Sequence, residues 1–228
     1  MEALQTFWSG LDWSVPLDML ISVIPALVCI TLHELAHGYV AWRLGDPTAK
    51  LSGRLTLNPL KHIDIFGLLM MIVFKFGWAK PVPVDMRNFR NPKRDMAICA
   101  LAGPVCNFVL CGFLMLIYGM LLYPLSMASS PFADIVINTM FQASYLSLAL
   151  AIFNLIPISP LDGSKVFFSF LSREKYYKLM RYERYGMIIL LVIVAADIIP
   201  LSKVTWFVYE KLFFIAEFGF DVVTNIFI

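Results

Sequence analysis

The stretch Val28-Cys-Ile-Thr-Leu-His-Glu-Leu-Ala-His37 decides what the rest of the chain must provide. It lies within an apolar run from Val15 to about Leu44, which is long enough for a helix that crosses a membrane. Because residues i and i+4 share one face of a helix, His33 and His37 can present two imidazoles to a single metal ion. Glu34 lies about 100° round the helix from His33, where it can take a proton from a water molecule beside that ion.

The apolar surroundings of these three ionisable side chains favour the metal interpretation. A charged side chain at the centre of a membrane span costs about 2.5–3.5 kcal/mol on insertion scales, so three together need a compensating partner. The pattern HExxH is typical of zinc hydrolases, which use three protein ligands and leave a fourth position open for water. The soluble pattern HExxHxxGxxH is absent, because Val40 and Arg43 stand at its glycine and last histidine positions. A third ligand must therefore come from elsewhere in the chain.

The composition predicts an α-helical protein that crosses the membrane several times. Of the 228 residues, 60% are hydrophobic and 15% charged, and the mean hydropathy is +0.76. Soluble domains are closer to half apolar and a quarter charged. The four cysteines form no CxxC or finger pattern, so we expect them to be reduced.

About six membrane segments are expected, in one domain spanning residues 1–228. Five apolar stretches are separated by polar residues: Leu17–Leu44, Ile63–Gly77, Asp95–Tyr123, Ala133–Ile156 and Tyr185–Leu201. The second has only about 15 residues and predicts a partial or tilted helix. The final segment, Val204–Ile228, is either an interfacial helix or a sixth crossing. This places the catalytic core at about 16–165 and further membrane segments at about 185–228.

Two short segments predict a small membrane-associated β-hairpin or sheet beside the histidines. Thr48–Asn58 alternates between polar and apolar residues. Trp78–Asp85 contains Pro81 and Pro83, which push the preceding residues toward extended geometry and suit an edge strand. Irregular interfacial loops fit these residues equally well.

The basic residues predict the orientation in the membrane. Ten of the 18 lysines and arginines lie between Arg43 and Arg94, and six more lie between Lys165 and Arg184. The positive-inside rule places both regions in the cytosol, which puts the N-terminus outside. We expect His62, in the first of these regions, to be a surface or gating residue rather than a ligand.

Asp162 is the best candidate for the third ligand. It follows the fourth apolar stretch, in Phe153-Asn-Leu-Ile-Pro-Ile-Ser-Pro-Leu-Asp-Gly163, on the side of the membrane to which the His37 end of the first stretch is assigned. The prolines break the helix before it, and Gly163 allows a sharp turn back into the bundle. The alternative is a loop aspartate that caps a helix starting near Ser164. The residues alone leave the two readings open.

Four motifs together resemble the site-2 protease family of intramembrane zinc metalloproteases, peptidase family M50. The HELAH segment is followed by Asn154-x-x-Pro157-x-x-x-Leu161-Asp162-Gly163. Between them, Gly103-Pro-Val-Cys-Asn107 is similar to the GxxxN element of that family, and Gly53–Asp64 is similar to a segment of its compact prokaryotic members. The resemblance covers about Pro16 to Lys165, without the PDZ or CBS domain of other branches. Ile65 departs from the pattern, because compact members tend to have proline there.

The resemblance implies a function and a set of site residues. One Zn²⁺ per chain would be held by His33, His37 and Asp162, and Glu34 would be the general base. Asn107 and Asn154 would bind substrate. The substrate would be a transmembrane protein or peptide, cut near the cytosolic leaflet of a bacterial or archaeal cell membrane in regulated intramembrane proteolysis. Membrane lipid would surround the protein and nucleic acid would have no part, while the oligomeric state stays open.

Two alternatives from other classes share these residues. A membrane metal-ion transporter would use the same three ligands for an ion in transit, but would gain little from Glu34. A scaffold that binds membrane proteins without cutting them would not need the intact HExxH pattern and Asp162.

Overall fold

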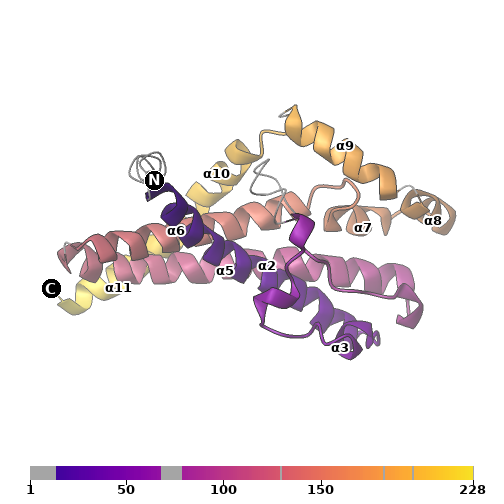
Figure 1. The fold of residues 1–228 in the computed structure, drawn as a ribbon, viewed down its shortest axis with the longest axis horizontal. Coiled ribbons are helices and arrows are strands. Elements are labelled where there is room, and N and C mark those ends of the chain that lie inside the picture. The colour runs from indigo at the N-terminus through magenta and orange to yellow at the C-terminus, as the bar shows by residue number, and fades with distance from the viewer. Residues whose placement is uncertain (1–13, 68–78, 129, 182, 197, 228) are drawn as a thin grey trace, which may run out of the picture.

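Three long apolar helices form the centre of the protein. The computed structural model describes residues 14–67, 79–128, 130–181, 183–196 and 198–227. Helix α2 (Ser14–Arg43), helix α5 (Pro92–Ala128) and helix α6 (Pro131–Asn154) carry most of the apolar sequence. Each contains a segment long and apolar enough to cross a membrane, which in α2 is Val23–Arg43. Figure 1 shows α5 running the length of the molecule, with α2 crossing it obliquely.

Shorter helices surround this centre. Helix α3 (Thr48–Leu51) and the 3₁₀ helices η1 (Pro59–Lys61) and η2 (Met86–Asn88) lie between α2 and α5 in sequence. Helix α7 (Asp162–Phe168) follows α6 and packs against α5. The chain continues through α8 (Arg173–Arg181), α9 (Glu183–Ala195), α10 (Leu201–Leu212) and α11 (Phe214–Phe227). Helix α10 packs on α6, and α11 packs on α5.

Glycines let α5 and α11 approach until their backbones touch. A Cβ atom on Gly119 would lie 1.9 Å from the carbonyl oxygen of Ala216, and one on Gly219 would lie 2.5 Å from that of Leu116. Small residues at such crossings are typical of membrane helices, whose association depends on close packing rather than on release of water.

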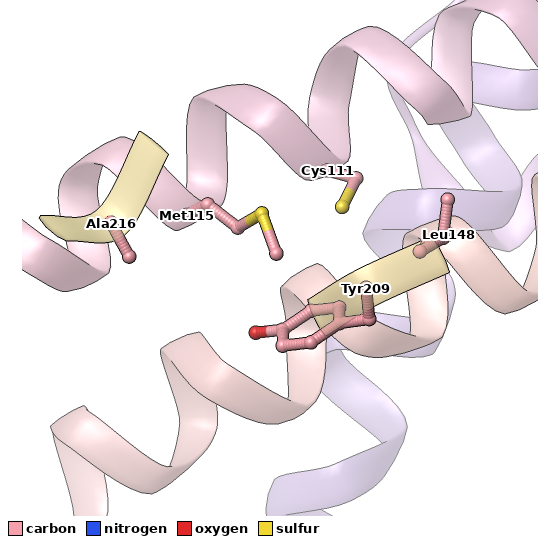
Figure 2. Packing of buried hydrophobic residues seen from close by; sticks show 5 residues of the cluster. All are labelled: Cys111, Met115, Leu148, Tyr209 and Ala216. Atoms are coloured by element: carbon pink, nitrogen blue, oxygen red, sulfur yellow. The ribbon is translucent and has the colours of Figure 1, made fainter. Parts of the chain in front are cut away.

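A cluster of buried side chains joins α5, α6, α10 and α11. It consists of Cys111, Met115, Leu148, Tyr209 and Ala216. Figure 2 shows Cys111 and Met115 pointing from α5 toward the ring of Tyr209. The Tyr209 hydroxyl lies 2.7 Å from that of Ser144 on α6. The polar end of this buried tyrosine is therefore satisfied inside the protein, as an apolar surrounding requires.

The predicted strand within Thr48–Asn58 is wrong. The Thr48 N–H donates to the Asp46 carboxylate at 3.0 Å, and the chain turns into α3 instead. Gly53 then adopts a φ of 64°, a left-handed conformation that ends any extended run. Residues 79–85 are extended as predicted, but within the described residues their β pairing is limited to one bridge between Ile63 and Ala79.

Of the six predicted membrane segments, three correspond to helices that are long and apolar enough to cross a membrane. Helix α9 has 13 residues, α10 has 12 and α11 has 14, and each is shorter than the roughly 20 residues that a span needs. Pro200 stands directly before α10 and α11 begins after a break at Phe213, so the C-terminal apolar sequence is divided. Most of the second predicted segment, residues 68–77, lies outside the described residues. The single domain of residues 1–228 stays a prediction.

Candidate metal centre and active-site cavity

Helix α2 brings the two histidines of the HELAH segment together as their spacing predicts. His33 and His37 are both buried, with 7% and 8% of their surfaces exposed. Their Nε2 atoms lie 3.0 Å apart, although one turn of helix separates the two residues. Both imidazoles therefore point at a single place beside the helix.

Asp162 meets these imidazoles from the other end of the sequence. Its Oδ2 atom lies 3.2 Å from Nε2 of His33 and 3.1 Å from Nε2 of His37. Asp162 is the first residue of α7, yet that helix has no side-chain cap from Leu161, the residue before it. Its carboxylate faces the histidines, and Lys165 lies 3.7 Å from its Oδ1 atom. Gly163 is needed for contact rather than for a turn, because a Cβ there would lie 2.2 Å from the Leu155 carbonyl oxygen.

The three side chains fit a metal ion. Their donor atoms all lie within 4.8 Å of one another, and two imidazole nitrogens with one carboxylate oxygen are a usual zinc ligand set. The lone pairs of these three atoms point at one another inside the protein. Because buried lone pairs this close repel each other, a proton or a cation must lie between them. Gly103 on α5 leaves room at this point, since a Cβ there would lie 2.4 Å from Nε2 of His37.

The tautomer of His37 also suits metal binding. Its Nδ1 atom lies 2.8 Å from the carbonyl oxygen of Cys99. A carbonyl can only accept, so Nδ1 carries the hydrogen and the Nε2 lone pair is available for a metal. The Cys99 thiol donates in return to the His37 carbonyl at 3.4 Å. Nδ1 of His33 has no hydrogen-bond partner among the described residues.

Glu34 is the acidic neighbour of this centre. It is half-buried, and its Oε2 atom accepts a hydrogen bond from the backbone N–H of Val82 at 2.8 Å. Val82 lies in the extended segment 79–85, far from Glu34 in sequence. The carboxylate is thus held in place by a backbone group that no side-chain motif would reveal.

A cavity of about 660 Å³ opens onto these groups. Its lining includes all six residues that the sequence singles out, namely His33, Glu34, His37, Asn107, Asn154 and Asp162. Asn107 is fully buried, and neither atom of its side-chain amide has a partner among the described residues. The Asn154 amide donates to the Leu150 carbonyl of its own helix at 2.9 Å.

His62 is predicted to be a surface or gating residue, and of these two predictions the surface position is wrong. Only 2% of its surface is exposed, and it lines the same cavity. Its Nε2 atom lies 3.0 Å from the Thr56 carbonyl oxygen, which draws the ring inward despite the basic residues nearby in sequence. Sequence reasoning also missed the contacts of Cys99 and Val82, because both use backbone atoms that every residue has.

Fold and site together define a helical membrane protein with a buried centre of two histidines and a carboxylate. The chain matches the sequence profile of peptidase family M50 over residues 21–196, more than half its length, and it belongs to that family. The predicted family and the predicted enzyme class, a metalloprotease, are thereby confirmed.

Curated relatives carry names of the same class. The chain is 42% identical over 178 residues to "Putative zinc metalloprotease YwhC" of Bacillus subtilis, which covers 75% of this chain and 78% of that protein. It is 29% identical over 198 residues to "Putative zinc metalloprotease Rip2" of Mycolicibacterium smegmatis, covering 85% and 71%. These names agree with the predicted zinc cofactor. No solved structure matches the chain.

Proposed function

We propose that this member of family M50 is an intramembrane zinc metalloprotease that hydrolyses peptide bonds of transmembrane proteins or peptides. The observation that carries the proposal is the meeting of His33, His37 and Asp162 beside Glu34, among helices long enough to span a membrane. The two imidazoles and the carboxylate form the ligand set, and Glu34 follows the first ligand directly, as in HExxH hydrolases.

Each residue has a role in the proposed reaction. His33, His37 and Asp162 hold the ion, and the Cys99 carbonyl keeps His37 in the tautomer that can bind it. Zinc, when bound, would act as a Lewis acid that lowers the pKa of a water molecule and polarises the carbonyl group of the substrate. Glu34 takes the proton from the attacking water and later passes it to the leaving amine.

The cavity supports a peptide substrate in an extended form. A transmembrane helix hides its carbonyl groups in its own hydrogen bonds, so it must unwind locally before it can be cut. Asn107 and Asn154 bring side-chain amides to the cavity, where they can bind the backbone of an unwound substrate. Residues 79–85 also line the cavity in part, and backbone carbonyl groups of this segment can accept hydrogen bonds from such a substrate.

The charge distribution supports cleavage near the cytosolic leaflet. Arg43 ends α2, Arg94 lies at the start of α5, and Lys165 lies in α7 close to Asp162. The end of α2, the start of α5 and helix α7 all lie in the right-hand half of Figure 1. By the positive-inside rule this end of the bundle faces the cytosol.

Exchange of Glu34 and of Asp162 tests the proposal. Purified Glu34→Gln protein should keep wild-type zinc content yet fail to cut any member of a panel of tagged single-span membrane proteins that the wild type cuts. Asp162→Ala should lose both zinc and cleavage, because it removes one of three ligands. Zinc is measured by elemental analysis and cleavage by the size of the tagged fragments.

Two results would contradict the proposal. Cleavage by Glu34→Gln at the wild-type rate would show that Glu34 is not the general base. Zinc uptake into sealed vesicles by a wild type that cuts no panel member would favour a transporter.

A further inference from the structure

The extended segment Ala79–Asp85, here called the strap, lies against α2 at the active site. Val82 donates its N–H to Glu34, and its side chain lies over Gly38. A Cβ on Gly38 would be 3.1 Å from Cγ1 of Val82 and 2.7 Å from Cδ2 of Leu55. Glu34 and Gly38 are four residues apart, so the strap contacts the helix face that carries the acidic residue.

The sequence of the strap leaves Val82 as the hydrogen-bond donor at its centre. Pro81 and Pro83 have no N–H, so among residues 81–83 only Val82 can donate from the backbone. The two prolines also restrict the local backbone to extended geometry. The central N–H is thus fixed in direction, and it points to a carboxylate rather than to a neighbouring strand.

Buried polar groups from the preceding loop hold both ends of the strap. At one end, Nη2 of the buried Arg54 donates to the Lys80 carbonyl at 2.7 Å, and the Lys80 N–H donates to the His62 carbonyl at 2.9 Å. At the other end, the fully buried Asp46 accepts the Asp85 N–H at 2.7 Å. Neither anchor is a metal ligand, and neither lines the cavity.

We propose that the strap positions the general base, with Arg54 and Asp46 as its anchors. A glutamate on a helix can adopt many rotamers, whereas proton transfer needs one of them held within reach of the water. A hydrogen bond from a fixed N–H to a carboxylate is short and strong enough to select that rotamer. It occupies one carboxylate oxygen of Glu34 and leaves the other for the reaction. This inference rests on the proposed function, because it needs Glu34 to be the base.

Amide hydrogen exchange tests the contact without using activity. In zinc-loaded wild type the Val82 amide should be protected, and its position between two prolines makes it easy to resolve. Glu34→Gln keeps a carbonyl acceptor and should keep the protection. Glu34→Leu removes the acceptor and should speed exchange about tenfold, as expected for the loss of one hydrogen bond. Equal exchange in the two variants would overturn the inference.

Turnover measurements test whether the contact matters for the reaction. Val82→Pro removes the N–H at a position already restricted by Pro83, and Val82→Ala shortens the side chain but keeps the N–H. We expect Val82→Pro to keep its zinc and to lose about tenfold in kcat relative to Val82→Ala, with KM little changed. The substrate is a tagged protein that the wild type cuts.

The anchor Arg54 gives a second variant should Val82→Pro fail to fold. Arg54→Met should speed exchange of the strap amides and lower kcat about tenfold, and Arg54→Lys, which restores a donor, should recover part of both. Arg87→Gln is the matched control, because Arg87 is exposed and pairs with Asp85 at the surface.

The outcomes separate the two proposals. Wild-type kcat in both Val82→Pro and Arg54→Met, together with an inactive Glu34→Gln, would overturn the proposal that the strap positions Glu34. The proposed function would still stand. An active Glu34→Gln would overturn the proposed function itself.

Discussion

Gly103 shows how much the proposed metal centre depends on a missing side chain. A methyl group at this position would lie 2.4 Å from Nε2 of His37 and 2.6 Å from Nε2 of His33, inside the space that an ion needs. The glycine sits in the interior of α5, where alanine would be the better helix former by about 1 kcal/mol. Its place there is therefore explained by the site and not by the helix.

Gly103→Ala should weaken zinc binding by at least about tenfold, because the imidazoles must move apart to admit the methyl group. Competition with a chelator of known affinity measures the change. Gly112→Ala is the control on the same helix, since its Cβ would meet only Cδ1 of Ile215, at 3.7 Å. Equal zinc affinity in both variants would show that Gly103 does not shape the site.

For single residues, the sequence predicts contacts between side chains better than contacts made by backbone groups. The spacing of His33 and His37 is enough to predict their convergence, because a helix fixes it. Asp162 is 129 residues from His33, so its partnership was open until the resemblance supported it. The Val82 contact has no side-chain signal at all, although a lone N–H between two prolines is a pattern that invites a search for its acceptor.

The close crossing of α5 and α11 is the main constraint among the helices. Gly119→Ala would bring a Cβ to within 1.9 Å of the Ala216 carbonyl oxygen, and backbone on both sides cannot yield easily. We expect a loss of about 2 kcal/mol in the free energy of unfolding, the usual range for overpacking. Thermal unfolding in detergent measures it, with Gly112→Ala again as the control. An unchanged midpoint of thermal unfolding in Gly119→Ala would show that the close crossing of α5 and α11 does not contribute to stability.

Helices were easier to predict than the segments between them. Long apolar runs gave α2, α5 and α6, since a membrane span requires a helix of at least this length. The alternation at Thr48–Asn58 misled because the buried Asp46 carboxylate accepts the Thr48 N–H at the start of α3, a local contact that outweighs the alternating pattern. The C-terminal sequence was harder to predict, because an average of hydropathy over a window does not show where α10 and α11 begin and end.

The proposed metal centre joins distant parts of the whole molecule, since residues of α2 and α7 meet there. Removing zinc should therefore lower the thermal stability of the whole protein. A ligand at 100 times its Kd stabilises the folded state by about 2.7 kcal/mol, which is lost on chelation. Melting curves with and without chelator measure this. Glu34→Gln should show the same shift and Asp162→Ala none, whereas a shift in Asp162→Ala would place the ion elsewhere.

The cavity beside the proposed metal centre affects how water reaches the reaction. Hydrolysis consumes one water for each bond cut, and the hydrocarbon interior of a membrane holds almost none. A volume of about 660 Å³ is room for roughly twenty waters at their liquid density. A peptide that fills part of this space still leaves room for water, so the proposed reaction at membrane depth need not wait for its second reactant to arrive through lipid.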